Sequence, residues 1–69
     1  MLPDITYIVR IECTDGSVDI WEHTPYEDAK AHYDMFDESD AEMYSRVVLI
    51  ERNWNKKKDY DTTLEVKVL

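Results

Sequence analysis

The stretch ITYIVRIECTDGSVDIWEH, residues 5–23, decides the fold. Its first half, Ile5 to Cys13, places an apolar or small side chain at every second position, which is the pattern of a β-strand. The only glycine of the chain follows Asp15, and a second alternating run begins at Val18. Because Asp-Gly between two alternating runs is a strong signal for a tight turn, the stretch predicts a β-hairpin.

A two-residue turn at Asp15-Gly16 fixes the expected register of this hairpin. It sets Ile11 opposite Ile20 and Arg10 opposite the ring of Trp21. In this register the aliphatic residues of both strands share one face of the sheet. We therefore expect Ile20 to belong to the core.

A helix is predicted directly after the hairpin. Thr24 suits the N-cap, Pro25 the first helical position, and Glu27 completes a capping box. The apolar residues that follow recur at helical spacing and should face the sheet. They are Tyr26, Ala29, Tyr33 and Phe36. The helix should fray around residues 37–39, where acids oppose its dipole.

Two more strands complete the expected fold. Residues 43–52 form an apolar strand, residues 53–61 a polar loop, and residues 62–69 a second alternating strand. The fold class is therefore α+β, in the order ββαββ: one domain, 1–69, with a mostly antiparallel four-stranded sheet and one helix on one face. The expected core is Tyr7, Val9, Ile11, Ile20, Tyr33, Phe36, Val48, Ile50 and Val66.

Length and composition limit the class of protein. A chain of 69 residues must use most of its apolar side chains for folding, so a buried catalytic pocket is not expected. No apolar run is long enough to cross a membrane, and Asp4 stands where a signal peptide would carry bases. Cys13 is the only cysteine, which excludes an intrachain disulfide and favours a reducing cytosol. We expect a cytoplasmic protein.

The charge is concentrated in one segment. The net charge is −8, and residues 15–42 contain ten acids against the single base Lys30, a local charge of −9. Residues 43–69 contain six bases against four acids, a charge of +2. Solubility explains acids on a surface, but it does not require their concentration in one segment. The uneven distribution favours a surface that docks a basic partner.

No pattern of catalytic or metal-binding residues is present. His23 and His32 lack the spacing of a zinc site, and the acids at 37–42 lack the glycine and ligand order of a calcium loop. No serine has a base at motif spacing, and there is no glycine-rich phosphate loop. We predict no enzyme, no metal and no cofactor.

Lys56, Lys57 and Lys58 are interpreted as a solvated loop, because a net charge of −8 repels a phosphate backbone.

The segment 6–51 resembles the short phage-encoded uracil-DNA glycosylase inhibitors. The shared features are the Asp15-Gly16 turn, Glu22-His23 at the end of the second strand, an acidic aromatic helix with Tyr33 and Phe36, and the 47–50 strand. The strand at 62–69 departs from that outline. The resemblance implies a small phage protein that acts as a DNA mimic against a host protein.

The leading hypothesis is thus a protein-binding inhibitor in the bacterial cytosol, directed at a basic DNA-binding or defence protein, with no direct contact to nucleic acid or membrane. Its expected binding residues are Trp21, Tyr26, Glu27, Asp28, Asp34, Asp37, Glu38, Asp40 and Glu42. Homodimerisation stays open. The alternative is an assembly module that self-associates through a sheet edge, with the acids serving solubility only.

Overall fold

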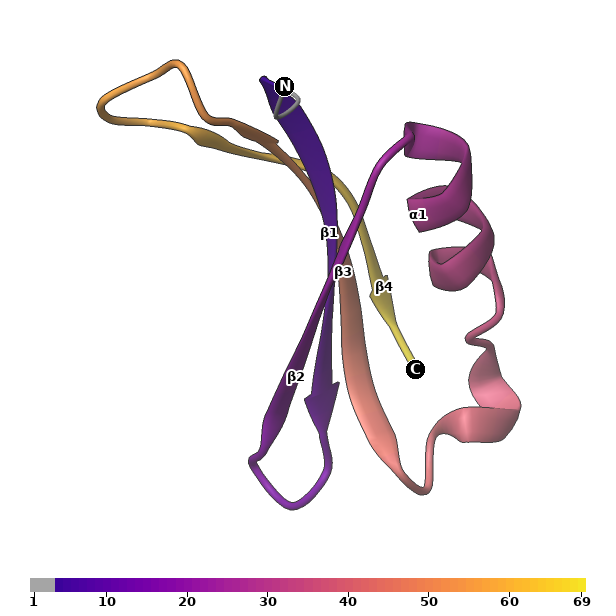
Figure 1. Cartoon of the computed structure of the whole chain (residues 1–69). Helices are drawn as coiled ribbons and strands as arrows, with labels where there is room; N and C mark the ends of the chain where they lie inside the picture. Colours follow the sequence, from indigo (N-terminus) through magenta and orange to yellow (C-terminus); the bar gives the residue numbers. More distant parts are fainter. Residues whose placement is uncertain (1–3) are drawn as a thin grey trace.

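The computed structural model describes residues 4–69 and contains a four-stranded antiparallel sheet with one helix on one face (Figure 1). In chain order, the elements are β1 (Ile5–Cys13), β2 (Val18–His23), α1 (Tyr26–Asp34), the short 3-10 helix η1 (Glu38–Asp40), β3 (Tyr44–Asn53) and β4 (Asp61–Val68). The predicted α+β fold and its ββαββ order are confirmed.

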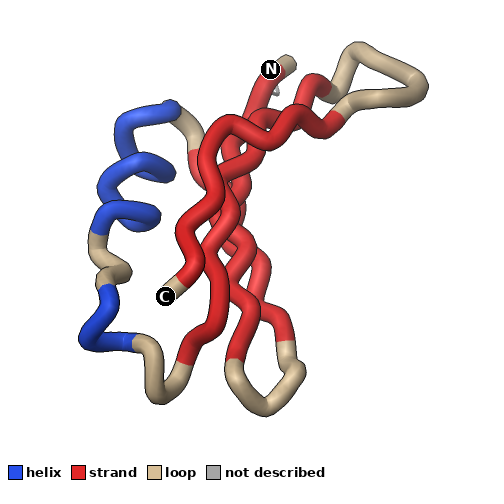
Figure 2. Tube along the Cα trace, turned by 180° about the vertical axis from the view of Figure 1, so that it is seen from behind, coloured by secondary structure: helices blue, strands red, loops and turns tan. Residues whose placement is uncertain are grey.

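The strands lie in the order β2-β1-β3-β4, so β1 and β3 form the centre of the sheet and β2 and β4 its edges. Two hairpins, β1–β2 and β3–β4, are joined through α1 and η1. This connection starts at one edge and returns to the sheet at its centre, and α1 lies along one face on the way (Figure 2).

The core lies between α1 and the inner face of the two central strands. Alternate residues of β1 and β3 point toward the helix, which presents Ala29 and Tyr33 to them. The strand residues of this cluster are Val9, Ile11, Val47 and Leu49. Val9, Val47 and Leu49 are fully buried, so these are the side chains whose loss the fold tolerates least.

The β1–β2 turn differs from the prediction by one residue. The loop has three residues, since the Cys13 N–H donates to Ser17 O (2.8 Å) and the Gly16 N–H donates to Cys13 O (3.1 Å). Gly16 has a φ of +91°, the conformation that follows a type I turn in a three-residue hairpin loop. The predicted two-residue turn is therefore wrong. Arg10 pairs with Ile20, and Val9 with Trp21.

This shift of one residue moves the β2 side chains to the other face of the sheet. Ile20 lies on the face opposite the helix and is 63% exposed, so its predicted place in the core is wrong. Val66, also predicted in the core, pairs with Val48 on that same outer face and is 51% exposed. Trp21 instead lies on the helix side.

The helix starts one residue later than predicted. Pro25 is the N-cap, and no side chain caps the helix there. The expected capping box of Thr24 and Glu27 is therefore wrong, because these two residues no longer hold the N-cap and N3 positions. Glu27 and Asp28 fall in the first turn, where their charge favours the positive end of the helix dipole.

Side chains of β4 hold the helix against the sheet. Lys67 Nζ donates to the carbonyls of Tyr33 (2.9 Å) and Phe36 (2.7 Å), which lie at the C-terminal end of α1. Lys30 Nζ reaches Glu65 Oε2 at 2.7 Å. A lysine at the C-terminal end of a helix satisfies carbonyls that have no partner within the helix.

Candidate functional site

Carboxylates gather at the end of the sheet where β1 turns into β2. The β1–β2 turn packs against the segment between η1 and β3, since the Thr14 N–H donates to Met43 O (3.0 Å) and the Thr14 hydroxyl to Glu42 O (3.1 Å). This contact joins the acids of two segments that are far apart in the sequence. We call the combined surface the acidic end. It consists of Asp15, Asp19, Asp37, Glu38, Asp40 and Glu42.

A shallow pocket of about 400 Å³ lies within the acidic end. Asp15, Asp19 and Glu42 line it together with Cys13 and Met43. Three carboxylates around one depression suit the side chain of a lysine or arginine from a partner, because charge-assisted hydrogen bonds are among the stronger ones. The pocket is thus a candidate anchor point for a basic side chain.

Local hydrogen bonds keep two of these carboxylates in place and ionised. Ser17 donates its N–H (2.9 Å) and its hydroxyl (2.6 Å) to Asp15 Oδ1, and these bonds lower the pKa of Asp15 below its ordinary value. Ser39 lowers the pKa of Asp37 in the same way, with both its hydroxyl and its N–H. The Asp37 N–H in turn donates to Asp40 Oδ2 (3.1 Å), which closes a capping box at η1. The predicted fraying around residues 37–39 is therefore replaced by an ordered turn.

The basic side chains are mostly engaged within the molecule. Arg10 and Arg46 both reach Glu12, at 3.8 and 2.6 Å, and Lys30 reaches Asp34 and Glu65. Arg52 pairs with Asp61, and Lys67 caps the helix. By contrast, the six carboxylates of the acidic end form no ion pair with any residue of the described range 4–69. Their charge is therefore free to act on a partner.

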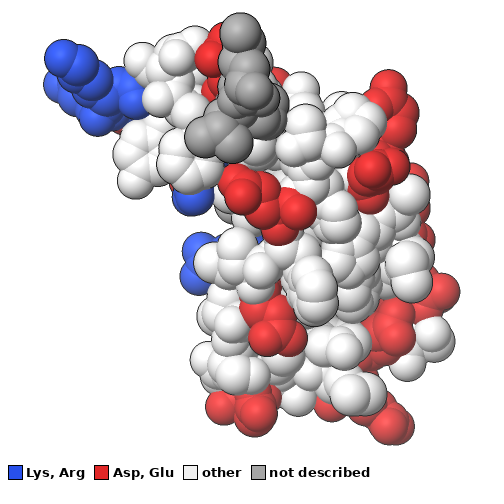
Figure 3. All heavy atoms as spheres, in the orientation of Figure 1, with Lys and Arg blue, Asp and Glu red and all other residues white. Residues whose placement is uncertain are grey.

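The residues predicted for binding fall into three places. Asp37, Glu38, Asp40 and Glu42 lie in the acidic end, whereas Glu27 and Asp28 lie about a helix length away, in the first turn of α1. Asp34 is exposed but pairs with Lys30. Figure 3 shows acidic side chains along the helix side and around the lower end of the molecule.

The two predicted aromatic anchors differ in exposure. Trp21 is 54% exposed, and its ring meets His32 edge-on at 5.8 Å. Tyr26 is only partly exposed, because its ring packs edge-on against Tyr7 at 5.3 Å, beside the core. The expectation that Tyr26 is fully exposed is therefore wrong, and its role in binding stays a prediction. Trp21 is available for contact, and Tyr26 belongs to the fold.

Sequence reasoning missed the contribution of Asp15 and Asp19 to the site. Both were counted in the acidic segment, but nothing in the local pattern shows that the first turn touches the segment before β3. That contact depends on the strand order, which places β1 between β2 and β3.

A histidine pair connects α1 to β2. His23 Nε2 and His32 Nδ1 are 2.9 Å apart, so one ring donates its proton to the other. Burial, and then the neighbouring charge of His23, lower the pKa of His32 below its ordinary value near 6.5. The charged form of His32 is thus less stable in the folded protein than in the unfolded chain.

This pair should make the stability depend on pH. The unfolded chain binds a proton at His32 more readily than the folded one, so the contribution of His32 to the free energy of unfolding is greatest above about pH 6.5 and falls as the pH is lowered through that range. We expect the denaturation midpoint in urea to fall between pH 7.5 and about 5. In His32→Phe, which keeps an aromatic ring beside Trp21 and Phe36, this fall should be smaller. An equal fall in both proteins would contradict the role of His32.

A second pocket lies at the β3–β4 loop. It measures about 260 Å³ and is lined by Arg52, Asn53, Trp54, Lys56, Lys57 and Tyr60. Together with Lys58, the two lysines form what we call the lysine tip, which protrudes at the upper left of Figure 3. The loop and the acidic end thus lie at opposite ends of a molecule 39 Å long (Figure 1).

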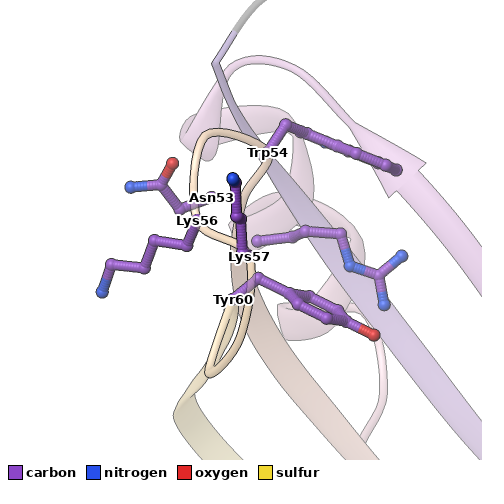
Figure 4. A pocket seen from close by; sticks show the side chains of 6 residues that line it. Asn53, Trp54, Lys56, Lys57 and Tyr60 are labelled. Carbon is purple, nitrogen blue, oxygen red and sulfur yellow. The ribbon is translucent and has the colours of Figure 1, made fainter.

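The polar groups of this loop pocket do not converge on one point. Arg52 stacks between the rings of Trp54 and Tyr60, 5.5 and 5.4 Å from their centroids, and both Asp61 oxygens accept from it at 2.7 and 2.9 Å. Figure 4 shows Lys56 pointing away from Trp54 and Tyr60. The guanidinium is therefore already neutralised, and the arrangement serves to hold the hairpin.

Other classes of site find no support in the described part of the chain. Across residues 4–69, no three histidine, cysteine, aspartate or glutamate side chains are grouped to hold a metal ion. The nine-residue helix α1 is too short to span a membrane, and no other described helix could do so.

Comparison of the chain with protein-family models, curated proteins and solved structures found no match.

Proposed function

We propose that this protein is a non-enzymatic binding protein that docks onto the basic, nucleic-acid-binding surface of another protein through its acidic end. The observation that carries the proposal is the asymmetry of ion pairing. Five of the eight basic side chains are engaged inside the molecule, whereas the carboxylates of the acidic end have no ion-pair partner within residues 4–69.

Such a surface is suited to compete with DNA. A groove that binds DNA holds lysine and arginine side chains against phosphates, and fixed carboxylates can take the place of those phosphates. Asp15 and Asp37 are held by hydrogen bonds from serines, so their orientation is set before binding. Bound in this way, the protein would block the groove and act as an inhibitor of a host DNA-binding or defence protein. The resemblance to uracil-DNA glycosylase inhibitors supports the same mode of action.

The acidic charge also predicts how binding would behave in solution. Opposite charges raise the association rate and lose their effect as salt screens them. Binding through the acidic end should therefore weaken strongly between low and physiological salt. Binding that depended on apolar contacts alone would change little over that range.

The test compares two double variants of equal charge. Glu38→Lys with Glu42→Lys removes two carboxylates of the acidic end that make no side-chain hydrogen bond or ion pair within the described residues. Asp4→Lys with Glu51→Lys changes two acids at the other end of the sheet. Each pair of reversals adds four charges, so both proteins go from −8 to −4. The two variants therefore differ in where the charge is changed, and their net charge is the same.

The immobilised protein is exposed to a bacterial lysate, and the retained proteins are identified and eluted with double-stranded DNA. We expect basic DNA-binding proteins to be retained by the wild type and by the Asp4/Glu51 variant, to be released by DNA, and to be lost from the Glu38/Glu42 variant. Retention of the same proteins by the Glu38/Glu42 variant, no release by DNA, or no retained basic protein would each contradict the proposal.

A further inference from the structure

The strand β4 has an unpaired outer edge. It is the last strand of the sheet, and its side chains Leu64, Val66 and Val68 are 40, 51 and 78% exposed. In Figure 2, where β4 leads to the end marked C, the helix lies beside the sheet and leaves this edge uncovered. Unprotected edges of this kind are ready to pair with another strand.

The direction of the backbone groups on β4 follows from the ladder to β3. The Leu69 N–H donates to Ser45 O at 3.1 Å, so Leu69 is bonded to the β3 side. In an antiparallel ladder bonded and non-bonded pairs alternate, and Lys67 and Glu65 therefore also bond toward β3. The N–H and C=O groups of Val66 and Val68 point away from the sheet.

The sequence Leu64-Glu65-Val66-Lys67-Val68 is complementary to itself when two copies run antiparallel. With a two-fold axis at Val66, Glu65 of one copy lies opposite Lys67 of the other. Leu64, which has no partner on β3 because the register shifts there, falls nearest to Val68 of the copy. Val66 lies opposite Val66 of the second copy. The outward N–H and C=O groups of these two residues meet as a hydrogen-bonded pair. The register therefore matches apolar with apolar side chains and acid with base.

Neighbouring registers are much less favourable. Moving the axis to Glu65 places two glutamates opposite each other, and moving it to Lys67 places two lysines opposite each other. Like charges directly opposite destabilise a strand pair. The charges of β4 thus select a single register for a second copy.

We propose that the protein forms a two-fold homodimer in which β4 pairs with β4 of a second copy, centred on Val66, to give a continuous eight-stranded sheet. On the helix side of β4, the charges of Lys30 and Lys67 balance those of Asp34 and Glu65, so this edge carries no net charge that would repel a second copy. The dimer uses neither the acidic end nor the lysine tip. Both acidic ends stay free in the dimer. The dimer proposal therefore does not depend on the proposed binding function.

One test removes the outward hydrogen bond of Val66. Val66→Pro deletes an N–H that does not bond to β3, and proline is tolerated at such an edge position. Ile20→Pro is the matched control, because Ile20 is exposed on the other edge strand, and its N–H also points outward by the same alternation from the Cys13–Ser17 bond. Sedimentation equilibrium of the full chain measures the dimer dissociation constant, and circular dichroism checks that each variant is folded.

We expect the wild type and Ile20→Pro to dimerise with similar constants, and Val66→Pro to dimerise at least tenfold more weakly. A wild type that stays monomeric at about 0.5 mM, where even weak pairs form, would overturn the proposal. Equal dimerisation of Val66→Pro would overturn it as well.

A second test reads the register directly through cysteine cross-linking. In a Cys13→Ser background, Val66→Cys places two cysteines opposite each other, about 5.5 Å apart between Cα atoms, within disulfide range. Val68→Cys places them four residues apart along the pair, roughly 13 Å, which is too far. Mild oxidation should link the first variant much faster than the second. Equal rates would overturn the register, and this result does not depend on how stable the proline variants are.

Discussion

Leu49→Ala should lower the free energy of unfolding by about 3 kcal/mol, because the fully buried leucine fills the space between β3 and α1. The loss combines the transfer of the removed carbons to water with the cavity left behind. A domain of this size has a total stability on the order of 5 kcal/mol, so the variant should lie near the limit of folding. Urea denaturation followed by circular dichroism gives the difference.

The control is Leu64→Ala, which removes the same carbons from an exposed position on β4. Its cost should be well under 1 kcal/mol for the monomer, measured at a concentration where no dimer forms. If Leu49→Ala costs no more than Leu64→Ala, the described core is wrong.

Lys67→Met should cost about 2 kcal/mol and should loosen the helix before the sheet. The methionine keeps the apolar stem but removes the ammonium group that binds the Tyr33 and Phe36 carbonyls. Hydrogen bonds to charged groups contribute more than neutral ones, and here two are lost at the end of a helix of only nine residues. The lysine Nζ also lies 4.3 Å from the centroid of the Tyr33 ring, a further attraction that is lost.

Lys56→Met is the matched control, since Lys56 is exposed in the β3–β4 loop and its side chain forms no hydrogen bond or ion pair within residues 4–69. Its stability should stay within about 0.5 kcal/mol of the wild type. Hydrogen exchange locates the effect: the amides of α1 should lose protection in Lys67→Met while those of β1 and β3 keep it. A uniform loss over the whole chain would show that Lys67 does not act through the helix.

The fold could be predicted because its signals are local. Alternation marks the strands, Asp-Gly marks the first turn, and helical spacing marks α1. The register of the first hairpin could not be predicted in the same way. Gly16 suits a two-residue loop and a three-residue loop equally well, and only the bonds between Cys13 and Ser17 distinguish them. The difference of one residue in loop length is the reason that Ile20, expected in the core, lies on the outer face of the sheet.

The candidate site, like the hairpin register, could be predicted only in part from the sequence. The density of acids in residues 15–42 is visible in the sequence, and it correctly indicates where charge accumulates. Which acids are free is a question of tertiary structure. The pairing of Asp34 with Lys30 is local, since the two residues are four apart on α1. By contrast, Asp19 and Glu42 line one pocket although they are far apart in the sequence. Patterns along the chain carry no information about that long-range contact.

The strand order also bears on the rate of folding. The β1–β2 and β3–β4 hairpins join residues close in sequence and can form on a timescale of about 1–10 μs. The central pair β1–β3 joins Val9 to Leu49, forty positions apart, and closing that loop carries an entropic cost before any core contact compensates it. Docking of the two preformed hairpins, with α1 closing over the joint, is therefore the step that should limit how fast this small chain folds.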